Sequence, residues 1–435
     1  MNLTIENSWW FTGGLWQDSD LKRVKNSSLL YRPSPILPQE CLPDSVFTLR
    51  GPRRAGKTVA LKLLVAEMIE KEQFQPHQIV WLTFEGLRTL DQAEALLIEA
   101  DQKHHPLVLL IDEVTSLVGW QKVIKKMKDL GFWQNTCLIL TGSSAYDLKA
   151  GAERMAGRRG KSAHPDRVLL PMSYQQFLQQ PLIQNAASPT HLYLQSGGFP
   201  FRVEGVVESL QKNIPYDSQD RFQIFDDVFF YEIHRRKLER GIAIEIVQRL
   251  SSIGVSAISF DAFSKQTSVT RETIRRYLSA LGDSFLLATI SSFDTSRNRV
   301  ALKKDKKIIW VDPGISEFGY WLGLAPKPSD AQKAEWIVGA ELLRRYEKRL
   351  WEGLSAPRNV YTWKSSSGKE VDFLVIDQSR SLKDPFEVKY QNQIQDSDFL
   401  VMEKAFRRGT LITAATEKKR TQSLALPLEQ WLKGF

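Results

Sequence analysis

Between about residue 30 and residue 175, short apolar runs alternate with longer amphipathic ones. The runs that are short enough to be strands lie at residues 46–49, 79–84, 107–111, 137–141 and 168–170. Strands that helices cover on both faces consist of consecutive apolar residues, as these runs do. The alternation therefore predicts an α/β domain in which crossover helices connect the strands of a parallel sheet.

Beyond residue 175 the pattern changes twice. Residues 176–250 are expected to be mostly helical, and a helix–turn–helix is expected next, with helices at 260–265 and 268–281. The sequence Lys-Pro-Ser-Asp at 327–330 is typical of a linker. A helix at 331–349, followed by strands, is predicted after it.

Composition excludes several classes of protein. The chain has 435 residues, of which 42% are hydrophobic and 25% charged, so we expect several globular domains rather than a disordered or collagen-like chain. No apolar run approaches the roughly 18 residues that a membrane helix needs, and the first residues do not resemble a signal peptide. Cys41 and Cys137 show no pairing pattern, so neither a disulfide framework nor a zinc site is expected. These features predict a cytoplasmic protein without a membrane segment.

Charge and aromatic content indicate what the chain contacts. Lys and Arg total 59 and Asp and Glu total 50, which gives a net charge of +9 and favours a polyanionic partner such as nucleic acid. Nucleotides are anions too, so charge alone does not decide between the two. The first 30 residues contain Trp9, Trp10, Phe11 and Trp16, and we expect this N-terminal extension to dock on the rest of the chain.

The strongest motif is a loop of the form G-x-x-x-x-G-K-[ST], directly after the strand at 46–49 and directly before an amphipathic run at 59–69. Its residues are Gly51, Pro52, Arg53, Arg54, Ala55, Gly56, Lys57 and Thr58. Its glycines let backbone N–H groups wrap phosphates, and the helix N-terminus adds its positive end. Lys57 is expected to reach the β- and γ-phosphates, and the Thr58 hydroxyl to bind Mg²⁺. The loop predicts a nucleoside-triphosphate site.

Two later strands end in residues that would complete such a site. The run at 107–111 leads into Asp112 and Glu113. Asp112 would hold the Mg²⁺ shell, and Glu113 would orient and polarise the attacking water. The run at 137–141 ends in hydroxyl groups, so Thr141 or Ser143 is expected to sense the γ-phosphate. A capped strand-to-helix turn is the alternative for this segment.

The segments IDEVTSLVGWQ, TGSSAYDLKAGAERMAGRRG, LLPMSYQQFL and GGFP give the chain a resemblance to a known family. It resembles the AAA-type ATPases of bacteria and archaea that carry an uncharacterised C-terminal domain called DUF4143, over nearly its whole length. The resemblance implies an ASCE-type sheet, with an extra strand between the phosphate-loop strand and the Asp-Glu strand, and ATP rather than GTP. It also highlights Arg158 as an arginine finger, acting in its own chain or in a neighbouring subunit of a homo-oligomer. Arg154 and Arg159 are alternatives, and a solvated basic loop explains the same residues.

The second helix of the helix–turn–helix is predicted to have one buried face and one basic face. Ser268 or Thr270 would cap it. Its apolar residues fall at helical spacing and are Ile274, Tyr277, Leu278 and Leu281. Its arginines then face outward, as in a DNA-reading helix, and are Arg271, Arg275 and Arg276. The Lys-rich run at 303–307 is predicted to be a wing tip that touches phosphates, and a protein-binding module is the alternative.

The last block resembles the core of the PD-(D/E)xK nuclease fold, at residues 368–376 and 385–389. Asp372 and Glu387 would bind Mg²⁺ between adjacent strands, because oxygen ligands suit that hard cation. Lys389 would position or activate the water that attacks phosphorus. The resemblance therefore implies a second Mg²⁺ site with nuclease-like chemistry.

The helix at 331–349 offers a third acid for this site. Glu335 and Glu341 lie about 240° apart around the helix, so only one of them can point into the site, and Glu335 is favoured. A buried salt bridge between Asp372 and Lys389, without any cleavage, is the alternative explanation of the motif.

These features predict five segments. They are an N-terminal extension at 1–30, an AAA-type ATPase domain at 31–175, a helical segment at 176–250, a winged-helix-like domain at 251–328 and a nuclease-like domain at 329–435. We expect an ATP-hydrolysing protein whose nucleotide state is coupled to DNA engagement, with Mg²⁺-dependent DNA cleavage as a further expectation. The alternative is an ATP-driven regulatory or scaffolding switch that acts on a protein partner and has an inactive nuclease-like domain. A P-loop kinase is a third interpretation.

Overall fold

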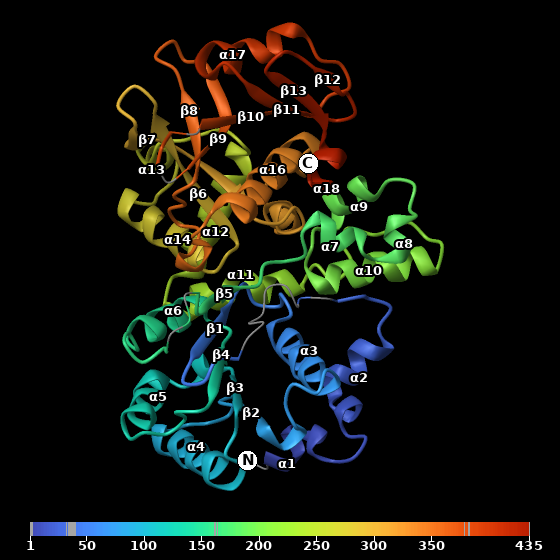
Figure 1. Ribbon diagram of the computed structural model, residues 1–435. Helices are drawn as coiled ribbons and strands as arrows, with labels where there is room; N and C mark the ends of the chain where they lie inside the picture. The colour runs from blue at the N-terminus through green and yellow to red at the C-terminus, as the bar shows by residue number, and fades with distance from the viewer. Residues whose placement is uncertain are drawn as a thin grey trace. The chain divides into compact units, whose positions relative to one another are not determined.

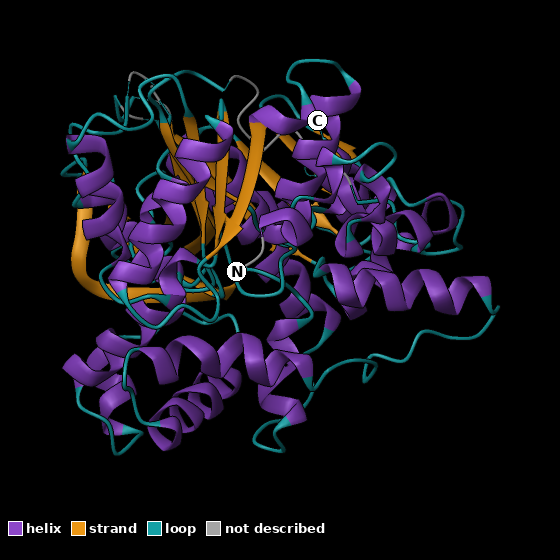
Figure 2. Ribbon diagram, turned by 90° about the horizontal axis from the view of Figure 1, so that it is seen from below, coloured by secondary structure: helices purple, strands orange, loops and turns teal. Residues whose placement is uncertain are grey.

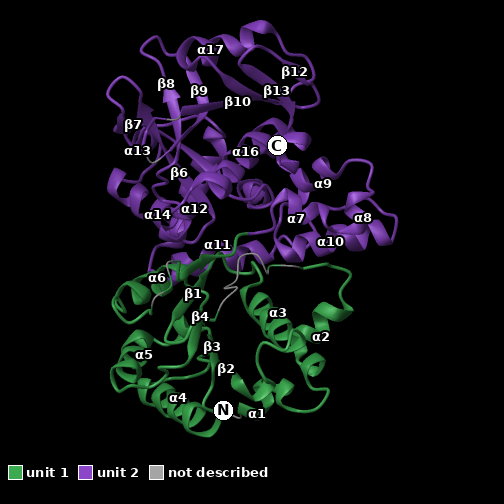
Figure 3. Ribbon diagram, in the orientation of Figure 1, with its two compact units in different colours: residues 1–170 green, residues 171–435 purple. Residues whose placement is uncertain are grey.

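The computed structural model describes residues 3–31, 33, 41–160, 162, 164–377, 379–381 and 383–434. The chain forms two compact units, residues 1–170 and residues 171–435 (Figure 3). Both units combine helices with strands, which confirms the predicted α/β class (Figure 2). The division into five segments is finer than these two units and stays a prediction.

The first unit contains a five-stranded sheet with the order β2-β3-β4-β1-β5, in which every neighbouring pair is parallel. The strands are β1 Val46–Arg50, β2 Ile79–Thr83, β3 Val108–Asp112, β4 Cys137–Thr141 and β5 Asp166–Val168. Because β4 lies between β1 and β3, the sheet has the extra strand expected of an ASCE-type core. The first four strands differ from their predicted bounds by one residue at most.

The fifth strand begins before its predicted position at 168–170. It pairs with β1 from Asp166 onward and lies at the edge of the sheet, where all three of its residues are only partly buried. An edge strand tolerates polar residues because one side stays open to water. The apolar residue Leu169 follows the strand, and its N–H still donates to the Arg50 carbonyl at 2.8 Å. The predicted run at 168–170 therefore overlaps the strand only at Val168, so it misses the start of the strand and extends past its end.

Helices cover both faces of this sheet and explain why β1 to β4 consist mainly of apolar residues (Figure 1). Leu109 and Ile111 of β3 pack in one buried cluster with residues of α4 Leu90–His104 and α5 Trp120–Asp129. Val108 and Leu110 pack in the other cluster with residues of α3 Lys57–Glu70. Successive residues of a strand point to opposite faces, so both faces must be apolar.

The N-terminal segment docks on the edge strand β2, as its aromatic residues predicted. It contains α1 Leu3–Glu6, η1 Ser8–Trp10, η2 Leu15–Gln17 and α2 Ser19–Asn26. The Asn7 amide bonds the backbone of Trp81 twice, accepting from its N–H at 2.6 Å and donating to its carbonyl at 2.9 Å. The indoles of Trp9 and Trp10 both donate to the Ile79 carbonyl. These bonds occupy backbone groups that would otherwise leave an open sheet edge.

The second unit begins with helices, as predicted for residues 176–250. They are α7 Tyr174–Leu178, α8 Pro181–Gln184, α9 Pro189–Ser196, α10 Pro200–Gln211, α11 Ile224–Arg235 and α12 Arg240–Ile253. The buried Asp312 carboxylate accepts from the N–H of Gly198 at 2.6 Å. A Cβ on Gly197, whose φ is +71°, would lie 2.0 Å from the same carboxylate. The GGFP segment therefore needs its first glycine for close packing against Asp312.

The helix–turn–helix is followed by a long hairpin. The helices are α13 Phe260–Lys265 and α14 Arg271–Asp283, and the hairpin strands are β6 Leu287–Asp294 and β7 Arg299–Trp310. The Lys-rich run at 303–307 is not at the hairpin tip, which lies at 295–298. A register shift pairs Ser291 with Lys306 and Ser292 with Ala301, so residues 302–305 have no partner in β6. The predicted wing tip is therefore a bulge inside β7, because the strand resumes pairing after it.

The hairpin belongs to an eight-stranded sheet with the order β12-β13-β11-β10-β9-β8-β6-β7. The other strands are β8 Val360–Lys364, β9 Glu370–Ile376, β10 Lys383–Lys389, β11 Gly409–Thr413, β12 Lys418–Lys419 and β13 Ser423–Pro427. Short η6 Ile315–Glu317 and α15 Phe318–Trp321, then α16 Asp330–Tyr346 and η7 Leu350–Glu352, precede β8. Helices η8 Asp396–Phe399 and α17 Leu400–Phe406 connect β10 with the parallel strand β11, and α18 Leu428–Lys433 ends the fold (Figure 1). None of the helices in the described part of the chain has the length and apolar composition that crossing a membrane requires.

Candidate functional site

The glycine-rich loop lies between the carboxyl end of β1 and the start of α3. Its two glycines are required by close approaches. Gly51 has φ of +149°, and a Cβ there would lie 2.0 Å from the Leu169 carbonyl oxygen. Gly56 has φ of +92°, and a Cβ there would lie 2.7 Å from the Tyr31 hydroxyl. Because α3 begins at Lys57, the loop lies at the N-terminus of this helix, where the helix dipole favours an anion.

Lys57 and Thr58 both reach back across the loop. The Lys57 ammonium donates to the carbonyls of Pro52 at 2.9 Å and Gly51 at 3.2 Å. The Thr58 hydroxyl donates to the Asp112 carboxylate at 2.8 Å. The structure thus brings together the loop and the carboxyl end of β3, as the sequence predicted for a nucleotide site.

Asp112 is a buried carboxyl group at the end of β3. It also accepts from the Glu113 N–H at 2.9 Å. Burial raises the pKa of Asp112 to about 6, and the neighbouring Glu113 charge adds to the shift. A hydroxyl and a carboxylate in contact supply the oxygen donors that Mg²⁺ prefers. These two residues therefore fit the metal ion that the motif implies.

Glu113 is bound by Ser143, which follows β4. The Ser143 N–H donates to one carboxylate oxygen at 2.9 Å, and its hydroxyl donates to the other. Thr141 is turned elsewhere, since its hydroxyl donates to the Leu49 carbonyl of β1 at 3.0 Å. Of the two predicted sensors, Ser143 is the one that the structure places against the acid pair.

Two of the candidate finger arginines, Arg158 and Arg159, lie at the other end of β1. Arg159 forms a bidentate pair with Asp166 at 2.9 Å and donates to the carbonyl of Val46, the first residue of β1. Arg158 pairs with Asp129 on the surface, and Arg154 is exposed at the end of α6 Ala145–Glu153. The loop follows the last residue of β1, so Arg158 and Arg159 are a strand length away from the nucleotide site of their own chain.

Tyr31 is a contact that the sequence analysis missed. Its hydroxyl donates to the Ala55 carbonyl at 3.0 Å, with the Gly56 carbonyl at 3.4 Å. The residue stands 24 positions before Ala55 and belongs to no motif. The sequence shows Tyr31 only as an aromatic residue shortly before the first strand, which is not enough to predict a contact with the loop.

Three predicted acids of the second unit come together. Asp372 in β9 and Glu387 in β10 are neighbours, and the Asp372 N–H lies 3.3 Å from a Glu387 carboxylate oxygen. Glu335 of α16 joins them, because it contacts the same lysine ammonium as Asp372. Glu341 is turned away and pairs with Arg345 at 2.9 Å. The helix thus presents the acid that the sequence favoured.

The cation in this cluster is Lys307 of β7, which no motif indicated. Its ammonium donates to Asp372 at 2.8 Å and to Glu335. Lys389 instead lies 3.7 Å from Glu387 with its side chain 41% exposed, so the predicted alternative pairing of Asp372 with Lys389 is not formed. Burial raises the pKa of Glu335 to about 7 and that of Glu387 to about 8, and Asp372 contributes to both shifts.

This cluster does not fit the metal that the nuclease resemblance implies. Lys307 stands between Glu335 and Asp372, where a bridging cation would bind. The second Asp372 oxygen accepts from the Val388 N–H at 2.9 Å. Over the described residues, no group of three His, Cys, Asp or Glu side chains is arranged to hold a metal ion.

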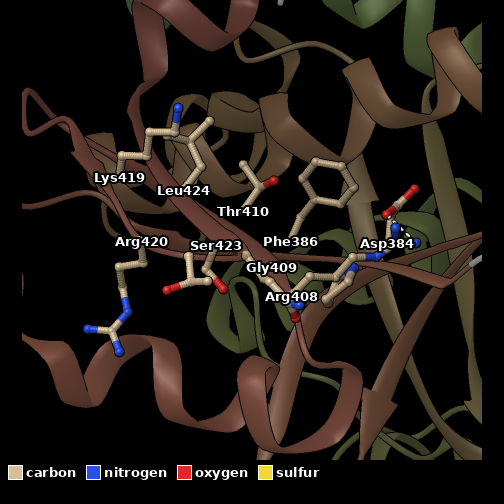
Figure 4. Close-up of a pocket in the computed structure, with 12 residues that line it drawn as sticks. Asp384, Phe386, Arg408, Gly409, Thr410, Lys419, Arg420, Ser423 and Leu424 are labelled. Carbon is tan, nitrogen blue, oxygen red and sulfur yellow. Dashed lines mark ion pairs between the residues drawn. The ribbon is translucent and has the colours of Figure 1, made fainter.

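A separate pocket of about 350 Å³ opens at the start of β10, β11 and β13. Figure 4 shows the Arg408 guanidinium beside Asp384, with which it forms an ion pair at 2.7 Å. Arg420, on another side of the pocket, pairs with Glu403. Since these charges are paired and the pocket is lined by none of the predicted site residues, it does not enlarge the candidate site.

The basic helix face has the predicted arrangement. Thr270 caps α14, and its hydroxyl accepts from the Thr273 N–H. The apolar stripe is buried and the arginines are exposed, namely Arg271, Arg275 and Arg276. Burial lowers the pKa of Lys306 of β7, and the nearby positive charge of Arg275 lowers it further. Arg275 of α14 and Lys306, which directly follows the β7 bulge, thus carry neighbouring positive charge.

Family models match three stretches of the chain. They are an AAA domain at residues 43–178, a domain of unknown function (DUF8612) at residues 191–326 and a domain of unknown function (DUF4143) at residues 332–431. An uncharacterized protein of Haemophilus influenzae is 26% identical over 324 residues, which cover 69% of this chain and 75% of the relative. An uncharacterized protein of Methanocaldococcus jannaschii is 24% identical over 388 residues, which cover 83% of this chain and 78% of the relative.

Solved structures align less well. A Walker-type ATPase of Pyrococcus abyssi aligns with a TM-score of 0.40 and 14% identity over 62% of this chain and 89% of that one. The ORC2 protein of Aeropyrum pernix, in its ADPNP-ADP complexes, aligns with a TM-score of 0.38 and 11% identity over 77% of this chain and 93% of that one. Both scores are low, so the fold is assigned from the strand order and the family models. The chain therefore matches the models of an AAA domain and of a C-terminal DUF4143 domain, and the first unit has the strand order expected of an ASCE-type sheet.

Proposed function

We propose that the first unit binds and hydrolyses ATP, and that its nucleotide state is coupled to DNA engagement by the second unit. The observation that carries the first part is the contact between Thr58 and Asp112, since it joins the loop to the acid pair. A phosphate loop on one strand and a carboxylate on another form a catalytic site only when the fold brings them together.

Each residue of the site has a role in this proposal. Loop amides from Gly51 to Thr58 bind the phosphates, and Lys57 leaves the loop carbonyls to neutralise the β- and γ-phosphates. Thr58 and Asp112 would hold Mg²⁺, which supplies charge neutralisation on the phosphate oxygens. Glu113 orients the attacking water and accepts its proton. Ser143 keeps Glu113 in place until a γ-phosphate offers the hydroxyl another partner.

Arg158 is proposed to act in trans. Its position at the far end of β1 prevents it from reaching the nucleotide of its own chain. A neighbouring copy can present this surface to the loop, which makes a homo-oligomer part of the proposal. The Asp129 pair is exposed, so it costs little to break.

The proposal that the second unit binds DNA is based on the order of its helices and strands. Helix α12, a bridge residue at Ile258, then α13, α14 and the β6–β7 hairpin follow one another, and Ile258 pairs antiparallel with Lys306. A short strand that pairs with the hairpin, between the first and second helix, is typical of a winged helix. The exposed arginines of α14 and the lysines of the bulge then supply phosphate contacts.

One observation favours the second candidate, a switch that acts on a protein partner with an inactive nuclease-like domain. Lys307 occupies the carboxylate cluster that a nuclease would use for metal. DNA cleavage is therefore left out of the leading proposal, while DNA binding is kept.

The test is steady-state ATP hydrolysis with and without single-stranded and duplex DNA, with the same samples examined for cleavage. We expect hydrolysis that Lys57→Ala abolishes through lost nucleotide affinity. Glu113→Gln should retain ATP binding with slow turnover, and normal turnover would remove Glu113 as the base. Stimulation by DNA supports coupling, whereas hydrolysis that ignores DNA favours the protein-directed switch. A phosphorylated acceptor product would instead indicate a kinase.

A further inference from the structure

The carboxylate cluster of the second unit is assembled from four separate elements. Glu335 comes from α16, Asp372 from β9 and Glu387 from β10, and the lysine comes from the hairpin strand β7. The Lys307 ammonium contacts the first two acids, across 28 and 65 residues of sequence. Lys307 thus connects the hairpin both to helix α16 and to strand β9.

All of these side chains are largely removed from water. The Lys307 side chain is 7% exposed, and those of Glu335 and Asp372 are 12% and 19% exposed. Buried carboxylates of like charge require a counter-cation, because their mutual repulsion is poorly screened away from water. Lys307 is the cation in direct contact with two of the three acids, and its ammonium also lies 4.9 Å from the Phe373 ring.

Both carboxylate oxygens of Asp372 already accept a hydrogen bond. One Asp372 oxygen accepts from Lys307 at 2.8 Å, and the other accepts from the Val388 N–H at 2.9 Å. A magnesium ion needs oxygen ligands at about 2.0–2.1 Å in octahedral geometry. An ammonium between two carboxylates leaves no room for that shell and repels a dication.

We propose that Lys307 is the resident counter-ion of this cluster and excludes divalent metal from it, so that the second unit holds nucleic acid without cutting it. The exclusion of metal depends on residues of the second unit alone and therefore does not require ATP hydrolysis. Its consequence for nucleic acid rests on the proposed DNA engagement, and the metal-binding measurement below separates the two.

The test is a calorimetric titration of the full chain with Mn²⁺ in the absence of nucleotide. The wild-type chain should show no site that depends on Asp372. Lys307→Met should gain one site that binds at least about ten times more tightly than any wild-type site, since the acids lose their cation. Adding Asp372→Asn to Lys307→Met should remove the gained site. This double variant also separates the cluster from any metal bound at the phosphate loop.

Two matched variants keep the result interpretable. Lys307→Arg preserves the charge and should bind no metal at the cluster. Lys306→Met removes the neighbouring lysine, which reaches Ser291 instead, and should behave as wild type. If Lys307→Met folds poorly, its unfolding temperature should rise with Mn²⁺ more than that of wild type, because metal replaces the lost cation.

Two results would overturn the proposal. The first is a wild-type site that Asp372→Asn abolishes, or DNA cleavage by the wild-type chain that Asp372→Asn abolishes. The second is a folded Lys307→Met chain that gains neither a site nor metal-dependent thermal stability. If DNA binding is absent while the metal results hold, the exclusion of metal stands and only the proposed DNA engagement fails.

Discussion

The Glu113 carboxylate is held at both oxygens by Ser143, one through the backbone N–H at 2.9 Å and one through the hydroxyl. Ser143→Ala keeps the first bond and loses the second. A hydrogen bond to a charged group contributes about 1.5–3 kcal/mol, so we expect kcat to fall by about 10- to 100-fold with little change in KM. Steady-state ATPase kinetics measure both values. Unchanged kcat would show that the hydroxyl does not position Glu113.

Thr141→Val is the matched control, since it removes a hydroxyl from the same strand end. That hydroxyl donates to the Leu49 carbonyl, which is buried between neighbouring strands. Its loss should lower the free energy of unfolding by about 1–3 kcal/mol and leave kcat unaltered. A large loss of kcat in this variant would transfer the sensor role from Ser143 to Thr141.

Tyr31→Phe tests the contact that pins the phosphate loop. The hydroxyl binds the Ala55 carbonyl at 3.0 Å, next to Gly56 in its left-handed conformation. Without this bond the loop loses part of its preorganisation, and a net hydrogen bond of about 0.5–1.5 kcal/mol corresponds to about a 2- to 10-fold rise in the KM for ATP. Nucleotide titration and steady-state kinetics measure this effect. An equal loss in kcat would indicate that Tyr31 acts on the chemical step instead.

The first unit was predictable because its determinants are local. The phosphate loop is eight consecutive residues between a strand and a helix, and two acids follow the end of an apolar run. The burial of β3 on both faces explains why its apolar residues were easy to recognise. Tyr31 escaped prediction because its contact spans 24 residues and depends on how the N-terminal segment docks.

The second unit shows what local pattern cannot provide. Lys307 meets Asp372 across 65 residues, and only the joining of the hairpin to the C-terminal strands creates that contact. The bulge at 302–305 decides which lysines are exposed, since it interrupts the alternation of the strand. A sequence-based prediction that treats 303–307 as one run therefore mixes two exposed lysines, Lys303 and Lys304, with two buried ones, Lys306 and Lys307.

The pKa of Asp112 predicts how magnesium-dependent binding responds to pH. Burial raises this pKa from 3.8 to about 6, so the carboxyl is protonated below about pH 6 in the folded chain. Its contribution to stability is then present at acidic pH and lost as the pH rises through about 6. Metal affinity depends on pH in the opposite way and rises with pH, because the metal binds the deprotonated carboxylate.

We therefore expect the gain in ATP affinity on adding Mg²⁺ to shrink as the pH falls from about 8 to about 5. Nucleotide titrations with and without Mg²⁺ at several pH values measure this gain. Asp112→Asn should show a small gain that does not vary with pH. A wild-type gain that stays constant over this range would remove Asp112 from the metal site.

Substitutions of Arg159 and Arg158 should have different effects, because Arg159 has a structural role and Arg158 a proposed catalytic one. Arg159 forms a bidentate, mostly buried pair with Asp166, and although burial raises the pKa of Asp166, Arg159 holds it below the ordinary value. Arg159→Ala should lower the free energy of unfolding by about 2–4 kcal/mol, because it leaves a buried charge unpaired. Arg158→Ala should leave stability unchanged and lower kcat only at protein concentrations at which the chain self-associates. Chemical unfolding and concentration-dependent ATPase assays distinguish these outcomes.

The basic face formed by α14 and the β7 bulge predicts how DNA binding depends on salt. Arg275 and Lys303 are exposed and carry charge that a phosphate backbone can neutralise. Each lost phosphate contact reduces the slope of log K against log salt by about 0.9, so Arg275→Ala with Lys303→Ala should reduce it by about 2. Lys212→Ala, at the exposed end of α10, is the control and should leave the slope unchanged.

The comparison of DNA sequences then separates phosphate contacts from base reading. Substitution of a phosphate-binding residue weakens binding to all sequences alike, whereas substitution of a base-reading residue relaxes preference at one position. Lys303 lies in a bulge and should belong to the first kind, since an exposed lysine on an irregular segment offers charge without a fixed approach to a base edge. Arg275 lies on a regular helix, with its guanidinium 5.4 Å from the Phe260 ring. This contact can orient the side chain either for a phosphate or for a base edge. If the double variant does not change the slope, this face does not contact DNA. Its exposed positive charge would then favour binding to an acidic surface of a protein partner.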